Sequence, residues 1–168
     1  YIALNASVTV PEQWDMKKNL TLNVSTKNLN GEFEPANIKI TVEQLKQPSV
    51  IYRERYWVKP DIQNLSKEEF TKIYPDIAYL NEDKPESWEV LKVISTKAFN
   101  SKDKKEVDIE EMKNLPVGIY KIKLNSADKY GEKIEQIQYI TMYDLTQNTV
   151  PTPKTIYNQI SEDRVEVG

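Results

Sequence analysis

The chain of 168 residues contains no cysteine and no histidine. These absences exclude a cysteine nucleophile, a Cys/His zinc site, a Ser-His-Asp triad and a histidine general base. They do not decide the redox compartment, because a domain with a large enough core needs no disulfide bonds. No apolar run approaches the roughly 18 residues that a membrane span requires. We therefore predict that the chain is not an enzyme, holds no cofactor and does not insert into a membrane.

An excess of positive charge is also missing. The chain has 23 Lys and Arg residues against 26 Asp and Glu residues, which gives a net charge of -3. Arg53, Arg55 and Lys59 form a small basic patch, but acidic residues surround it in the sequence. A nucleic-acid surface needs a larger basic face than this, so nucleic acid is not an expected partner.

Seven segments predict β-strands. Five of them alternate apolar and polar residues, which marks a strand with one buried face, whereas 90–95 is an apolar run and 106–109 suits a short edge strand. Short turns separate most of these segments, and no strand alternates with a long helix. The pattern favours an antiparallel sandwich over a parallel α/β sheet. The predicted fold class is mainly all-β, a seven-stranded antiparallel sandwich of the fibronectin or immunoglobulin type. The predicted strands are 4–10, 19–26, 38–42, 90–95, 106–109, 119–124 and 134–142.

Glycine is scarce, and three of the four glycines lie at predicted turns. Gly31 and Gly131 occupy similar corners, NLNGE and DKYGE, where glycine accepts a positive φ without steric cost. Gly118 follows Pro-Val and precedes a strand that contains Tyr120. Tyr120 suits a tyrosine corner, in which the phenol bonds back to nearby backbone. The alternative is an ordinary core aromatic.

Residues 47–89 interrupt the rhythm of strands with an insertion of roughly fifty residues. A structureless loop of that length is unusual in a compact domain. Ser66 and Glu69 have the spacing of a capping box, which predicts a short helix that ends near Tyr74, before Pro75. We therefore predict a folded insertion that packs on one end or edge of the sandwich.

Tyr56, Trp57, Tyr79 and Trp88 make the insertion rich in aromatic residues. Two interpretations stay open. The rings form a platform for sugar rings or for the apolar patch of a partner, or they form the insertion's own core. The second interpretation is favoured, because a helix of two turns is not stable without packing.

The acidic residues do not single out a metal site or a catalytic pair. Asp76, Glu82, Asp83 and Glu86 cluster in the sequence, and carboxylates at such spacing are potential Ca²⁺ ligands. The EF-hand loop pattern is absent, however, and charges beside proline are typical of solvated loops. Among 26 acids, nothing marks out the pair that a glycosidase needs. We predict no metal site.

Four segments carry a resemblance to a known family: LNASVTVPEQWDMKKNLTLNVSTKNLNGE, QPSVIYRERYWVKPD, LSKEEFTKIYPDIAYLNED and LPVGIYKIKLNSADKYGE. They resemble one macroglobulin-type domain of the large bacterial alpha-2-macroglobulin-like proteins. The resemblance covers residues 1–144, which we predict to be one macroglobulin-like β-sandwich with its insertion at about 47–89. Residues 145–168 are predicted to be a linker, and its end, VEVG, resembles the opening of the following domain.

The resemblance implies a fibronectin-like sandwich within a string of domains that builds a large shell. In this family, proteases are trapped when they cleave a bait region, and some members capture them through a thioester made by a Cys and a Gln. This chain has no cysteine for a thioester, and no bait region can be identified in it. The implied role is a non-catalytic structural module of a secreted, periplasmic or cell-surface protease inhibitor of the bacterial envelope. Its partners would be neighbouring domains of the same chain, and proteases through the full-length protein.

A different class of function stays open beside this one. The chain would then be a surface binding module that grips a glycan or a protein with its aromatic insertion. Exposure of the four aromatic side chains discriminates between the two, because a contiguous exposed apolar patch favours binding.

Overall fold

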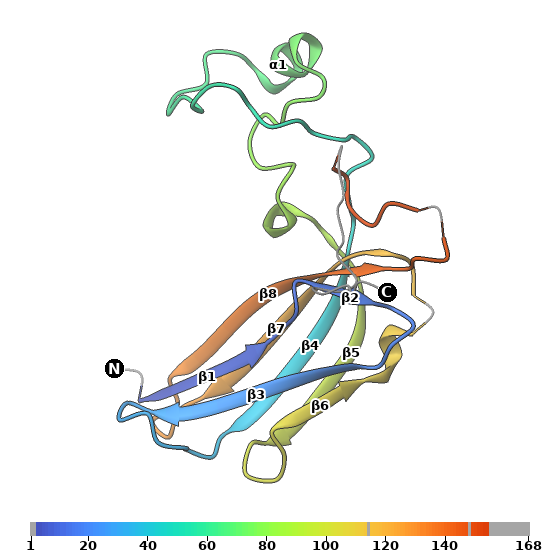
Figure 1. Ribbon diagram of the computed structural model, residues 1–168. Helices are drawn as coiled ribbons and strands as arrows, with labels where there is room; N and C mark the ends of the chain where they lie inside the picture. The colour runs from blue at the N-terminus through green and yellow to red at the C-terminus, as the bar shows by residue number, and fades with distance from the viewer. Residues whose placement is uncertain (1–2, 114, 148, 155–168) are drawn as a thin grey trace, which may run out of the picture.

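The computed structural model describes residues 3–113, 115–147 and 149–154. Within these ranges the chain is mainly β, with a three-stranded sheet of order β1-β3-β6 and a five-stranded sheet of order β2-β8-β7-β4-β5 (Figure 1). The strands are β1 (Leu4–Thr9), β2 (Gln13–Asp15), β3 (Leu20–Asn28), β4 (Asn37–Leu45), β5 (Val90–Asn100), β6 (Glu106–Ile109), β7 (Gly118–Ala127) and β8 (Lys133–Tyr143). No helix in the described ranges has the length and apolar character needed to cross a bilayer.

Each of the seven predicted strands coincides with an observed one, but the strand count and the uniformly antiparallel pairing were wrong. Residues 13–15, which lie outside the predicted strands, form β2, which pairs in parallel with β8. Its Trp14 packs against the core, and the indole nitrogen donates to the Lys18 carbonyl at 3.4 Å. A strand of three residues is too short to show alternation, so only the tertiary pairing reveals it.

The two sheets face each other across one apolar core. In β3 the buried and exposed residues alternate strictly, as in Leu20, Leu22 and Val24, and the same period holds along much of β4 and β7. All three strands contribute to a single cluster of buried side chains. Burial of each such side chain contributes about 1.5–3 kcal/mol. The shared cluster makes the molecule a β-sandwich-like scaffold.

The two similar corners have the same hydrogen-bond pattern. The side chains of Asn28 and Asp128 each accept backbone N–H groups two and four residues later, at 2.9–3.0 Å. Gly31 and Gly131 follow with φ values of 83° and 88°, and each donates its N–H to the carbonyl of that first residue at 3.0 Å. Both corners lie at the end of the sandwich far from the insertion (Figure 1). The recurring motif is therefore Asn/Asp-x-x-Gly-Glu, a turn held by its first side chain.

Gly118 and Tyr120 hold the start of β7. Gly118 has a φ of 153°, and a Cβ at this position would lie 2.6 Å from Nε2 of Gln47. The hydroxyl of Tyr120 donates to the Pro116 carbonyl at 2.7 Å, as in a tyrosine corner. The ring is buried in the sandwich core, and burial raises the pKa of the phenol to about 12. Tyr120 thus ties the incoming loop to the core.

Asp144 anchors the chain where it leaves β8. Its buried carboxylate accepts hydrogen bonds from the hydroxyl and the backbone N–H of Thr146 at 2.7 and 2.9 Å. Lys17 forms an ion pair with the same carboxylate at 3.3 Å. These contacts, led by the Thr146 hydroxyl, lower the pKa of Asp144 from 3.8 to about 2.

This carboxylate predicts an acid-sensitive part of the stability. Because the folded-state pKa is lowered, the stabilisation is complete above about pH 4 and is lost as the pH falls through 2. We expect Asp144→Asn to lower the free energy of unfolding at pH 7 and to have little effect near pH 1.5. Urea unfolding at several pH values measures this, with the exposed Asp83→Asn as the control. An Asp144→Asn effect that does not change with pH would contradict the assignment.

The insertion rises from the end of the sandwich where β4 ends and β5 begins (Figure 1). It contains α1 (Lys67–Ile73) and the 3-10 turn η1 (Pro85–Ser87); a second 3-10 turn, η2 (Glu110–Met112), follows β6. Ser66 and Glu69 form the reciprocal capping box at the start of α1, with bonds of 3.2 and 2.9 Å. The helix closes at Tyr74, just before Pro75. The sequence signals for this helix therefore match its observed start and end.

Candidate functional site

The insertion has a small core of its own. Phe70, Ile77 and Ala78 are buried, yet none of them belongs to the core cluster of the sandwich. Arg53 joins the two chain segments of the insertion: it forms a bridge with Ile77 and an ion pair with Asp76. The insertion is therefore held by its own contacts and not by burial between the sheets.

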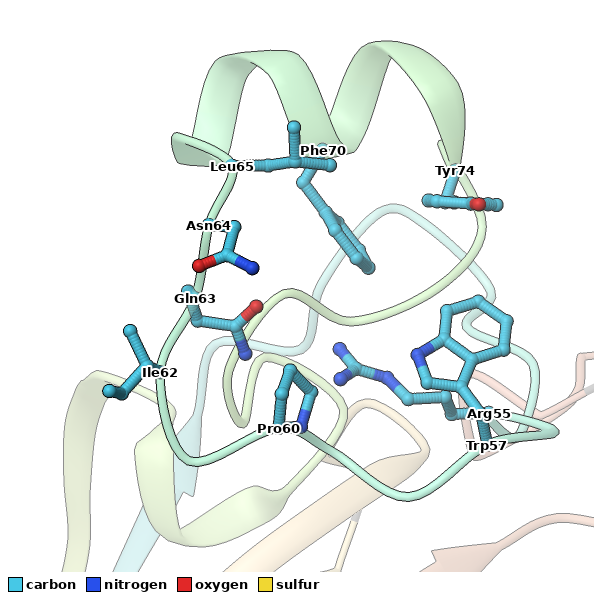
Figure 2. A pocket seen from close by; sticks show the side chains of 9 residues that line it. All are labelled: Arg55, Trp57, Pro60, Ile62, Gln63, Asn64, Leu65, Phe70 and Tyr74. Atoms are coloured by element: carbon cyan, nitrogen blue, oxygen red, sulfur yellow. The ribbon is translucent and has the colours of Figure 1, made fainter.

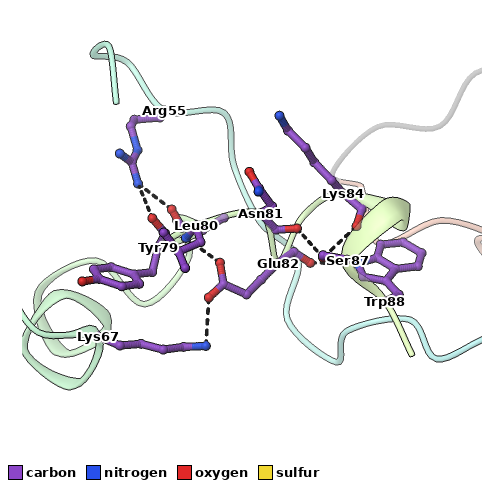
Figure 3. A network of polar contacts seen from close by, with 10 residues as sticks. Arg55, Lys67, Tyr79, Leu80, Asn81, Glu82, Lys84, Ser87 and Trp88 are labelled. Atoms are coloured by element: carbon purple, nitrogen blue, oxygen red, sulfur yellow. Dashed lines mark hydrogen bonds and ion pairs between the residues drawn. The ribbon is translucent and has the colours of Figure 1, made fainter. Parts of the chain in front are cut away.

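Arg55 is the central polar residue of this unit. Its Nη2 donates to the carbonyls of Ala78 and Tyr79 at 2.6 and 3.2 Å (Figure 3). Its guanidinium carbon lies 5.2 Å from the ring centroid of Phe70 and 5.6 Å from that of Trp57. Cation–π attraction at this distance is favourable, and more so where water is excluded. Arg55 thus links the first segment of the insertion to the segment that follows α1.

Four aromatic rings pack in a row, in the order Trp57, Tyr74, Phe70 and Tyr79. Tyr74 lies 5.1 Å from Phe70 and 5.2 Å from Trp57, and Tyr79 lies 5.4 Å from Phe70, all as tilted pairs. Such tilted pairs stabilise by about 0.5–1.5 kcal/mol beyond area burial. The Tyr79 hydroxyl donates to the Leu65 carbonyl at 2.8 Å, which fastens the cluster to the start of α1.

The structure separates the four aromatic residues that the sequence singled out. Trp57 and Tyr79 belong to the ring cluster, on opposite sides of Phe70 and Tyr74. Tyr56 lies outside it and is 86% exposed. Trp88 follows η1, and its indole nitrogen donates to the Glu82 carbonyl at 2.9 Å. The four residues are thus divided: some belong to the insertion's own core and some to its surface, so neither the platform nor the core interpretation holds for all of them.

Beside the ring cluster lies a hollow of about 220 Å³ (Figure 2). Apolar side chains form most of its wall, and the polar groups of Arg55 and Gln63 face it from opposite sides. Sequence reasoning missed Gln63 and assigned no role to Tyr74. The sequence signal that could have located this site is Arg55 in the aromatic-rich stretch RERYW, because guanidinium groups stack on aromatic rings. The lining residues are Arg55, Trp57, Pro60, Ile62, Gln63, Asn64, Leu65, Phe70 and Tyr74.

Glu82 is the acidic residue at the centre of a polar network in the insertion. Glu82 accepts the Leu80 N–H at 2.7 Å and pairs with Lys67 at 2.9 Å, and this bond raises the pKa of Lys67 (Figure 3). Ser87 donates to the carbonyls of Asn81 and Lys84 in the same network. Within the described ranges, no three side chains of metal-binding type converge. This network joins the segment after α1 to η1.

No protein-family model matches the chain, and a search of curated proteins finds no match. The resemblance to macroglobulin-type domains therefore rests on the four sequence segments alone.

Proposed function

We propose that the chain is a non-catalytic structural module of a large alpha-2-macroglobulin-like protease inhibitor, secreted or held at the cell envelope. Its fold would be a fibronectin- or immunoglobulin-like sandwich with an inserted docking element. The sequence resemblance supports the family, and the two facing sheets with a tyrosine-corner bond are compatible with the fold. Because one sandwich hosts many functions, the role has to be argued from the surface of the molecule.

The observation that carries the proposal is the apolar surface of the protruding insertion. Exposure alone also suits a binding module, so what decides between the two functions is whether a neighbouring domain covers this surface. Tyr56, Val58 and Ile62 are 86%, 91% and 77% exposed, although the sandwich below has a closed core. Single exposed apolar residues are ordinary, but several within one short segment are typical of a contact surface. In a string of domains, a neighbouring domain of the same polypeptide would cover this segment.

Hydrogen exchange on the isolated chain and on the full-length protein tests this docking. We expect residues 56–62 to exchange rapidly in the isolated chain and to be protected in the full-length protein. A double variant, Tyr56→Ser with Val58→Ser, should remove that protection and reduce the ability of the full-length protein to slow an added endopeptidase. Tyr130→Ser is the matched control, because Tyr130 is exposed in the corner at the other end of the sandwich. Equal exchange of residues 56–62 in both proteins would sink the proposal.

The hollow beside Trp57 and Tyr74 favours a second candidate function, a surface module that binds a ligand itself. Ligand sites are concave and mostly apolar, with a few polar groups that orient the ligand. The two candidates differ in what the isolated chain does. A binding module captures its ligand without neighbouring domains, whereas a shell module needs them.

A further inference from the structure

We infer that the hollow beside Arg55 binds a carboxylate group carried on an apolar body about the size of one ring. This inference rests on the second candidate function and names the chemistry of its ligand. It also goes beyond the four aromatic residues, since the groups that select the ligand are Arg55 and Gln63.

Two hydrogen-bond donors in the wall of the hollow lack acceptors. Nη1 of Arg55 and Nε2 of Gln63 are both shielded from solvent, and neither has a partner among the described residues. A buried donor without an acceptor is costly, so such groups in a folded protein call for an explanation. A carboxylate has two acceptor oxygens and meets an arginine fork in a planar, charge-assisted contact. One such group supplies acceptors to both residues.

The charge around the hollow also favours an anion. Among the described residues no carboxylate forms an ion pair with Arg55, whose other terminal nitrogen is bound to neutral carbonyls. A second hollow shares Arg55 and Trp57 with the first and is lined by Arg53, Lys59 and Lys84, with Asp83 as its acidic member. A half-buried cation without a counter-charge attracts an anion more strongly than an exposed one.

The apolar walls and the volume of the hollow indicate the size and polarity of the ligand beyond its carboxylate. Rings of Trp57, Phe70 and Tyr74 line the hollow together with Ile62 and Leu65. A cavity of about 150 Å³ accommodates benzene, so a hollow of about 220 Å³ accommodates one ring with a short acidic arm. A sugar acid would leave its hydroxyl groups against apolar rings, whereas an aromatic or aliphatic acid would not.

One wall is able to open for an entering group. In the described part of the chain, no hydrogen bond involves the backbone of residues 57–64, which carry Gln63. Segments held by side-chain packing alone open at low free energy. A small movement of this segment uncovers both donors without breaking a hydrogen bond.

The test is calorimetric titration of the whole chain with paired probes. Phenylacetate is compared with phenylacetamide, the peptide Ala-Ala-Phe with its C-terminal amide, and glucuronate serves as the sugar acid. We expect each apolar carboxylate to bind at least about tenfold more tightly than its amide. Stronger binding of the peptide than of phenylacetate would show that the bound carboxylate is the C-terminus of a polypeptide. Stronger binding of phenylacetate would show that it belongs to a small free acid.

Gln63→Glu supplies the decisive variant. It places a carboxylate within the hollow, where it pairs with Arg55 and repels the ligand, so binding should fall at least about tenfold while the melting temperature does not fall. Thr71→Glu adds the same charge on exposed α1, away from the hollow, and should bind normally.

Equal binding of acid and amide, preference for glucuronate, or unchanged binding by Gln63→Glu would overturn the inference. Amide binding would leave the surface-binding function standing, whereas no binding by any probe overturns the inference and gives that function no support.

Discussion

Replacing Phe70 with alanine is expected to unfold the insertion and leave the sandwich folded. Phe70 is 4% exposed and contacts Tyr74, Tyr79 and the guanidinium of Arg55. A buried Phe→Ala change costs about 3–5 kcal/mol. The remaining contacts of the insertion include one capped helix of two turns, the hydrogen bonds of Arg55 and Tyr79, and mostly exposed ion pairs, which contribute little each. The insertion therefore cannot absorb the loss, whereas the core cluster of the sandwich does not include Phe70.

Limited proteolysis and methyl NMR measure the two parts separately. In Phe70→Ala, chymotrypsin should cleave between residues 56 and 79 much faster than in the wild type. The methyl signals of Ile122 and Leu124, which are fully buried between the sheets, should keep their positions. Phe33→Ala is the matched control, because Phe33 is half exposed beside Lys105. Loss of the sandwich signals together with the insertion would show that the two parts fold as one unit.

Tyr120 is expected to be the most sensitive single position near the start of β7. Its ring is 1% exposed in the sandwich core, and its hydroxyl holds the Pro116 carbonyl at 2.7 Å. Tyr120→Ala should lower the free energy of unfolding by at least about 3 kcal/mol, as for other large buried aromatics. Tyr120→Phe keeps the ring and removes only the hydrogen bond, so we expect about 1–2 kcal/mol. The difference separates the packing of the ring from the corner bond.

Urea unfolding gives both values, and the pH dependence gives an independent check. Tyr130→Ala is the control, because this exposed tyrosine should change stability by less than about 0.5 kcal/mol. Burial raises the pKa of Tyr120 to about 12, so its contribution is complete below pH 10 and is lost as the pH rises through 12. Tyr120→Phe should lack that alkaline loss. If Phe and Ala prove equally destabilising, the ring is not part of the core.

Most strands of the sandwich were predictable because they show their buried face locally. Leu20, Leu22 and Val24 alternate with polar residues, and period two needs no knowledge of the partner strand. The capping box of Ser66 and Glu69 is equally local, since both bonds span three residues. In contrast, β2 depends on pairing with residues 141–143, more than a hundred positions away, and left no local signal.

The candidate site was only half predictable, for the same reason. Aromatic density pointed to the insertion, but which rings meet is decided by how the chain returns after α1. Arg55 reaches carbonyls 23 and 24 residues later, and its guanidinium lies beside the rings of both Trp57 and Phe70. Trp88 lies at η1 in a different local network, although sequence reasoning placed it with Trp57. Composition therefore identifies the segment, and long-range contacts determine the site.

Acrylamide quenching of tryptophan fluorescence tests the central claim, that the insertion offers an exposed apolar surface on a closed scaffold. Trp57 is 40% exposed, whereas Trp88 is less exposed and is hydrogen bonded. The account predicts that Trp57→Phe removes most of the red-shifted, readily quenched emission of the isolated chain, and that Trp88→Phe leaves that emission in place. If Trp57 is as blue-shifted and shielded as Trp88, the side of the insertion that carries Trp57 is closed, which contradicts the central claim there and the pocket that Trp57 lines.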